Sequence, residues 1–60
     1  MDIRSMQIVL EYRLATFKDL GEKNAEYHRD SGDHYFLGKQ QAYKLAAESI
    51  EDILQSYFEE

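Results

Sequence analysis

Residues 33–58 read DHYFLGKQQAYKLAAESIEDILQSYF and carry a large apolar side chain at every seventh position. The members of this repeat are Phe36, Tyr43, Ile50 and Tyr57. Residues spaced by seven lie along one face of a helix, so the stretch predicts a single amphipathic helix over about residues 33–58. Its apolar face must be covered by another surface.

The first half of the chain shows the same repeat. Its members are Ile3, Leu10, Phe17 and Asn24. A second row follows three residues behind them at Met6, Arg13, Leu20 and Tyr27, with Leu14 beside it. Asp2 precedes the first turn, where an aspartate side chain accepts a backbone N–H group that has no partner in the helix. The sequence predicts a helix over about residues 3–28 with both rows in its buried seam.

Two residues weaken this first helix. Gly21 costs about 1 kcal/mol relative to alanine in a helix interior, so the helix either ends at Leu20 or continues through the glycine. Continuity is favoured, because the repeat keeps its phase as far as Tyr27. Asn24 occupies a seam position, where a buried amide either fixes the register of the helices or leaves a partly hydrated packing defect beside Gly21.

A break separates the two repeats at residues 29–33, which read RDSGD. Gly32 adopts a positive φ without a Cβ clash, and Asp30, Ser31 or Asp33 supplies a side chain that caps the next helix. A connection this short folds the second helix back along the first. We therefore predict an all-α fold in which residues 1–60 form one domain, an antiparallel two-helix hairpin.

A row of small residues follows the second helix. Gly38, Ala42 and Ala46 are spaced by four, and Ser49 continues the row. Small side chains allow two helices to approach closely. The row predicts close packing against the first helix, with a contact between subunits as the alternative.

The chain is short for a self-sufficient core. Sixty residues bury only about 60% of their unfolded surface, and the absence of cysteine removes disulfides and thiolate zinc sites as supplements. Several apolar residues also fall outside the predicted seam. They are Ile8, Tyr12, Ala15, Leu45 and Phe58. We expect them to serve self-association, most simply as a homodimer in which two hairpins form a four-helix bundle.

Charge and composition disfavour several classes of function. The chain carries 12 acidic and 7 basic residues, a net charge of −5, which argues against direct binding to nucleic acid. No apolar run approaches the roughly 20 residues that span a bilayer, and the start lacks the pattern of a secretory leader. Together with the absence of cysteine, these features predict a cytoplasmic protein without a membrane partner.

Two polar clusters have the residue types of chemical sites. The first consists of His28, Asp30, Asp33 and His34 around the turn. The second consists of Glu48, Glu51 and Asp52. Helix capping explains the aspartates of the first cluster better than metal binding does. A di-metal site in a helical bundle requires a histidine three residues after a glutamate, which the second cluster lacks. We therefore predict no metal, no cofactor and no enzymatic activity.

Two segments resemble known families. Residues 50–57 read IEDILQSY and resemble the terminal segment of the small aspartyl-phosphate phosphatases that regulate sporulation, which are helical hairpins of similar length. That family carries a serine and an aspartate where this chain has Ala47 and Glu51, so phosphatase activity is not implied. Residues 35–43 read YFLGKQQAY and, with the acidic helix that follows, look like short proteins encoded by phages and mobile elements of Gram-positive bacteria. This second resemblance implies a compact inhibitor of host proteins, including bacterial defence complexes.

The main functional hypothesis is a non-enzymatic protein-binding module that occupies a site on a larger bacterial protein. Tyrosines are frequent at the energetic centres of interfaces, and acidic side chains steer association with a basic target. The candidate partner-binding residues are Tyr12, Tyr43, Tyr57, Glu48, Glu51 and Asp52.

Two alternatives stay open. One is an acidic mimic of DNA, in which carboxylates imitate a row of phosphates. Its residues would be Glu48, Glu51, Asp52, Glu59 and Glu60. The other is a transcriptional or developmental regulator that acts by exchanging helices with a homologous partner.

Overall fold

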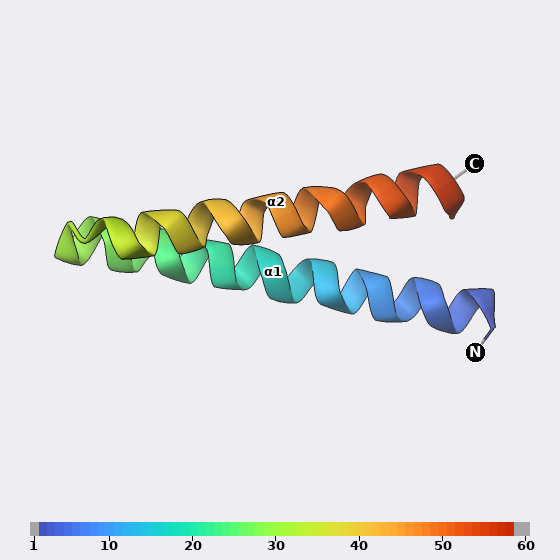
Figure 1. Ribbon diagram of the computed structural model, residues 1–60. Helices are drawn as coiled ribbons and strands as arrows, with labels where there is room; N and C mark the ends of the chain where they lie inside the picture. Colours follow the sequence, from blue (N-terminus) through green and yellow to red (C-terminus); the bar gives the residue numbers. More distant parts are fainter. Residues whose placement is uncertain (1, 59–60) are drawn as a thin grey trace.

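The computed structural model describes residues 2–58 and shows two helices, α1 over Ile3–Ser31 and α2 over His34–Tyr57. The helices lie side by side and run antiparallel (Figure 1). The beginning of α1 and the end of α2 therefore lie at the same end of a rod that measures 43 × 16 × 15 Å. This arrangement confirms the predicted all-α antiparallel hairpin.

The N-terminal cap of α1 is the predicted one. Asp2 has an extended backbone, and its Oδ1 accepts a hydrogen bond from the backbone N–H of Ser5 at 2.7 Å. This bond stabilises the ionised carboxylate and lowers the pKa of Asp2 below the ordinary value for aspartate. The contribution of the cap to stability is therefore fully present above that ordinary pKa and is lost as the pH falls through the lowered one.

The turn is shorter than predicted, because α1 continues through residues 29–31. It ends at Gly32, which has a left-handed φ of 70° and donates its N–H to the carbonyl of His28 at 2.8 Å. Asp33 caps α2, and its Oδ1 accepts a hydrogen bond from the backbone N–H of Tyr35 at 2.9 Å. Only Gly32 and Asp33 connect the helices, so α2 is held directly against α1 from its first turn.

Helix α1 is continuous through Gly21, as the phase of the repeat predicts. Gly21 faces α2 at the point where Tyr43 packs. A Cβ added to this glycine would lie 3.8 Å from the Cβ of Tyr43 and 4.0 Å from the backbone oxygen of Gln40. The glycine thus lets α2 approach closely without leaving the helical conformation.

The seam between the helices differs from the predicted one on α1. The seven-residue row faces α2, but the residues that share the seam lie four positions after its members. They are Gln7, Leu14, Gly21 and His28, all half-buried. The predicted second row is turned aside, with Met6, Arg13 and Tyr27 exposed and Leu20 half-buried. The physical reason is close approach, since the small Gly21 in this row faces the Cβ of Tyr43 and the backbone of Gln40 on α2.

The α2 half of the seam follows the predicted repeat more closely. It contains Phe36, Gln40, Tyr43, Ala47, Ile50 and Leu54. The ring of Tyr43 stacks on that of Phe17 with 6.1 Å between centroids. Ala47 and Leu54 are the buried apolar residues of the described chain. Tyr57 departs from the repeat and is 79% exposed, at the end of the rod where the two ribbons diverge (Figure 1).

The prediction that the row of small residues on α2 packs along α1 was wrong for most of the row. Gly38, Ala42 and Ser49 are exposed, Ala46 is half-buried, and nothing lies within 4 Å of where a Cβ on Gly38 would be. Helical spacing places the row on the flank of α2 that points away from the seam. Its small side chains are therefore available to a helix outside this hairpin.

We expect Gly21→Ala to stabilise the protein by about 0.5–1 kcal/mol, because alanine favours the helix and reduces the freedom of the unfolded chain. The new methyl group would meet Tyr43 at an ordinary contact distance. Urea unfolding followed by circular dichroism measures the change. Gly32→Ala is the matched control and should lower stability, because its φ of 70° is unfavourable for a residue with a Cβ. A loss of stability in Gly21→Ala would contradict the packing described for Tyr43.

Candidate functional site

The rod has two long sides that differ in chemistry. We call the first the polar side, marked by an ion pair between Lys18 Nζ and Glu51 Oε1 at 3.0 Å. We call the second the apolar side, marked by the contact of the Tyr27 and Phe36 rings, whose centroids are 5.4 Å apart. Helical spacing assigns the other residues to one of these sides, to the seam, or to the outer edge at the back of each helix.

A shallow groove of about 310 Å³ runs along the polar side between the two helices. Its floor is formed by seam and neighbouring residues Phe17, Gly21, Ala25 and Ala47. Its walls carry Lys18, Glu22, Gln40, Lys44, Glu48 and Glu51. The groove therefore combines an apolar floor with charged walls on which acids outnumber bases.

The ion pair between Lys18 and Glu51 contributes little to stability, but it holds one side chain of the groove wall in place. The Lys18 and Glu51 side chains are 56% and 38% exposed, and exposed pairs of this kind contribute roughly 0–1 kcal/mol. Because the two residues come from different helices, the pair fixes where one carboxylate of the wall lies. Glu48, one turn away on the same wall, has no ion-pair partner at salt-bridge distance in the described chain.

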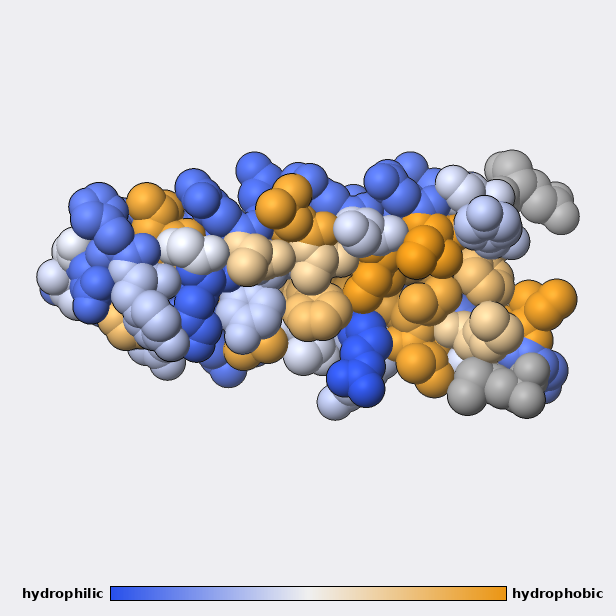
Figure 2. Space-filling view, viewed as in Figure 1, coloured by the Kyte–Doolittle hydropathy of each residue, from blue (hydrophilic) through white to orange (hydrophobic). Residues whose placement is uncertain are grey.

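The apolar side is the larger feature of the surface. Its exposed members from both helices are Met6, Val9, Tyr27, Tyr35, Ile53 and Tyr57. Apolar side chains gather on this face over the halves of the helices nearest the chain ends (Figure 2). Sequence reasoning missed this side because it placed Met6, Tyr27 and Tyr57 in the seam of the hairpin.

Charges on the apolar side have a single sign. By helical spacing Arg13 and Lys39 are its charged residues within the described chain, and Lys39 Nζ lies 5.4 Å from the ring centroid of Tyr35. The acids of both helices fall on the polar side or on the outer edges. The acidic residues of α1 and α2 thus leave one long face of the described chain free of negative charge.

The structure does not bring the predicted partner-binding residues onto one surface. Tyr43 lies in the seam against Phe17. The other five are dispersed: Glu48 and Glu51 on the polar side, Tyr57 at the end of the apolar side, and Tyr12 and Asp52 on the outer edges of α1 and α2. Glu48 and Glu51 are the two that share a site, the groove.

The residues predicted to serve self-association are divided in the same way. Ile8, Tyr12 and Ala15 form an exposed row on the outer edge of α1, where Tyr12 is 70% exposed. Leu45 is 65% exposed on the outer edge of α2, which faces the opposite direction. Phe58 is half-buried just after α2. One flat partner surface cannot cover both edges of a hairpin at once.

The polar cluster at the turn is accounted for by local structure. Asp33 is the cap of α2, and the His28 and His34 rings lie 5.7 Å apart. Within residues 2–58 no three side chains of the types that bind metal ions are grouped closely enough to hold one.

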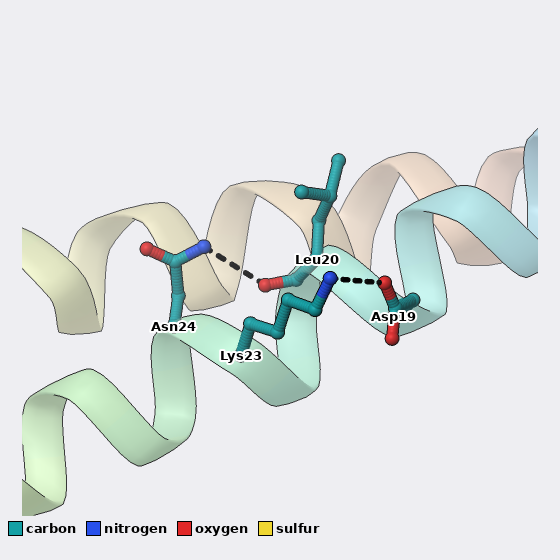
Figure 3. A network of polar contacts seen from close by, with 4 residues as sticks. All are labelled: Asp19, Leu20, Lys23 and Asn24. Carbon is teal, nitrogen blue, oxygen red and sulfur yellow. Dashed lines mark hydrogen bonds and ion pairs between the residues drawn. The ribbon is translucent and has the colours of Figure 1, made fainter.

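Asn24 is buried, but its amide is used locally. Its Nδ2 donates to the backbone oxygen of Leu20 at 2.8 Å, within α1 itself (Figure 3). The neighbouring pair of Lys23 and Asp19, 3.0 Å apart, lies on the exposed surface, and its hydrogen bond raises the pKa of Lys23. This bonding favours a local role for the amide over one that fixes the register of α1 against α2.

Comparison with known proteins adds no relative. No family model matches the chain, and neither a curated protein nor a solved structure matches it. Neither helix of residues 2–58 is long and apolar enough to cross a membrane. The functional argument therefore rests on the two long sides of the rod.

Proposed function

We propose that this protein is a non-enzymatic binding module that inhibits a larger protein by covering one of its sites with the polar side. The observation that carries this proposal is the groove, which has an apolar floor and charged walls on which glutamates outnumber lysines. Protein interfaces are built in this way, with an apolar centre and a polar rim. A lysine or arginine of the target would lay its aliphatic stem on the floor and its charge between the glutamates.

The cellular setting of the proposal comes from the sequence resemblance. From this resemblance we propose a phage-type inhibitor that acts in the cytoplasm of a bacterial host against a host or defence protein. The net charge of −5 supports a basic target, because opposite charges accelerate the encounter of two proteins. We further propose that the protein acts as a homodimer, which leaves the polar side free.

The DNA mimic is the less favoured alternative. Lys18 and Lys44 lie among Glu48 and Glu51 along the groove, so the described acids do not form an uninterrupted negative row. Glu59 and Glu60, which were part of that prediction, lie outside the described residues. Binding by mimicry would weaken steeply with salt, whereas binding on an apolar floor would persist. Helix exchange with a homologous partner is a separate proposal, and mixed heterodimers would reveal it.

We expect Glu48→Lys to weaken target binding by about tenfold or more, because the reversed charge would repel a basic side chain in the groove. The tagged wild-type protein is first used to isolate its partner from the bacterial host, and the affinity of the purified partner is then measured by calorimetry. Glu26→Lys is the matched control, since it makes the same change of charge on the outer edge of α1. Equal loss in both variants, or no stoichiometric partner for the wild type, would refute the proposal.

A further inference from the structure

We propose that the apolar side binds a second copy of this chain. The two copies would form a four-helix bundle whose two-fold axis runs parallel to the helices. This inference does not depend on the target of the polar side. It differs from the sequence prediction in its interface, because it uses the side formed by both helices instead of their outer edges.

The first argument is the deficit of burial in one hairpin. Ala47 and Leu54 are the apolar residues that the described chain buries, while ten large apolar residues stay exposed. A domain of this length is only marginally stable, and association with another chain is one of the few ways to enlarge its core. The core of a four-helix bundle is completed by facing helices in this way.

The second argument is the area of the side. A face of the rod measures about 43 by 16 Å, a footprint of roughly 700 Å², close to the roughly 800 Å² per partner of a standard protein interface. The apolar side therefore has about the area that a stable dimer needs.

The third argument is charge. Two copies with a net charge of −5 each would repel one another if their acids met across the interface. The acids of α1 and α2 lie on the polar side and outer edges, so packing of the apolar sides keeps the acids of the two copies apart. Arg13 is exposed on α1, and its long side chain extends its guanidinium into water at the margin of the interface.

The row of small residues on α2 fits the same arrangement. Gly38, Ala42 and Ala46 lie where the apolar side meets the outer edge of α2. In the proposed dimer this margin faces α1 of the second copy. Small side chains there permit close helix packing, which is the subunit role left to the row once packing inside the hairpin is ruled out for most of it.

The orientation follows from the uneven distribution of apolar side chains. They gather toward the chain ends (Figure 2). Tyr27, Tyr35 and Lys39 lie toward the turn, at the end of α1 and the start of α2. A two-fold axis parallel to the helices places the apolar ends of the two copies against each other. An axis perpendicular to the helices would instead place each apolar end against the tyrosines and lysine of the other copy. The parallel axis therefore buries more apolar surface.

Light scattering across a dilution series tests whether the partner of the apolar side is a second copy of the chain. The wild-type protein should have a mass of about 14 kDa, twice the 7.1 kDa of one chain, and Ile53→Arg should shift it to 7.1 kDa. Gln55→Arg introduces the same side chain on the other flank of α2 and should leave the dimer intact. A folded wild-type monomer, an oligomer larger than two, or a dimer that survives Ile53→Arg would overturn the proposal.

Disulfide cross-linking tests the orientation and does not require a folded monomer. The chain has no cysteine, so Met6→Cys gives a single thiol near the proposed axis. We expect the two copies of this variant to cross-link on mild oxidation, because a disulfide needs Cα atoms within roughly 7 Å. With a perpendicular axis the same residues would lie more than about 30 Å apart. Cross-linking of the polar-side control Glu22→Cys, or none with Met6→Cys, would overturn the arrangement.

Discussion

Leu54→Ala should leave the protein largely unfolded at room temperature. Leu54 is 7% exposed in the last turns of the α2 seam, and removing a buried leucine side chain costs about 2–5 kcal/mol. A core of this size supplies rarely more than about 3–5 kcal/mol of net stability. The substitution therefore removes most or all of it. Circular dichroism in the absence of denaturant, followed by urea titration of whatever structure persists, measures the loss.

Leu45→Ala is the control for this prediction. It makes the same chemical change on the same helix, but Leu45 is 65% exposed on the outer edge. A surface substitution of this kind should change stability by less than about 0.5 kcal/mol. Both variants must be compared at one protein concentration, because dimer formation makes apparent stability depend on concentration. If Leu45→Ala were the more damaging, the face of α2 assigned to the seam would be incorrect.

Local sequence rules were sufficient for the elements of the hairpin. Asp2, Gly32 and Asp33 are capping residues whose preferred positions follow from the backbone groups left free at a helix end. The phase of the repeat carried α1 correctly through Gly21. The helix ran three residues further than predicted, because Gly32 alone ends it and the polar residues before it stay helical.

The face of α1 that meets α2 could not be read from hydropathy. The row three positions behind the repeat contains Met6, Leu20 and Tyr27 and is the more apolar of the two candidates. The true seam row contains a glutamine, a glycine and a histidine. This row contains Gly21, which faces the Cβ of Tyr43 and the backbone of Gln40, and such close packing links positions far apart in the chain.

The position of the seam on α1 also determines which residues are exposed on the surface. With the seam on the glycine side, the more apolar row of α1 was left uncovered and became part of the apolar side. The groove on the polar side likewise depends on which flanks of the helices meet. Glu48 and Glu51 attracted attention in the sequence, but the ion pair of Glu51 with Lys18 and the groove that both glutamates line exist only in the folded hairpin.

Tyr43→Ala should cost about 3 kcal/mol of stability, at the lower end of the range for buried aromatic residues because Tyr43 is half-buried. Its ring stacks on Phe17 and its Cβ packs beside Gly21, so truncation removes the contact that places α2 over this row of α1. Tyr43 was a candidate anchor for a partner, and its position in the seam gives it a structural role. Urea unfolding of the isolated protein therefore detects its loss without any partner present.

Tyr12→Ala separates the structural role of a tyrosine from a binding role. Tyr12 is 70% exposed on the outer edge of α1, so its truncation should change the unfolding midpoint little. If the free energy of unfolding fell by about 3 kcal/mol in Tyr43→Ala and hardly at all in Tyr12→Ala, any loss of target binding by the first variant would report unfolding. If Tyr43→Ala instead kept its stability and lost only binding, Tyr43 would be a partner anchor and the stacked pair with Phe17 would not support the seam.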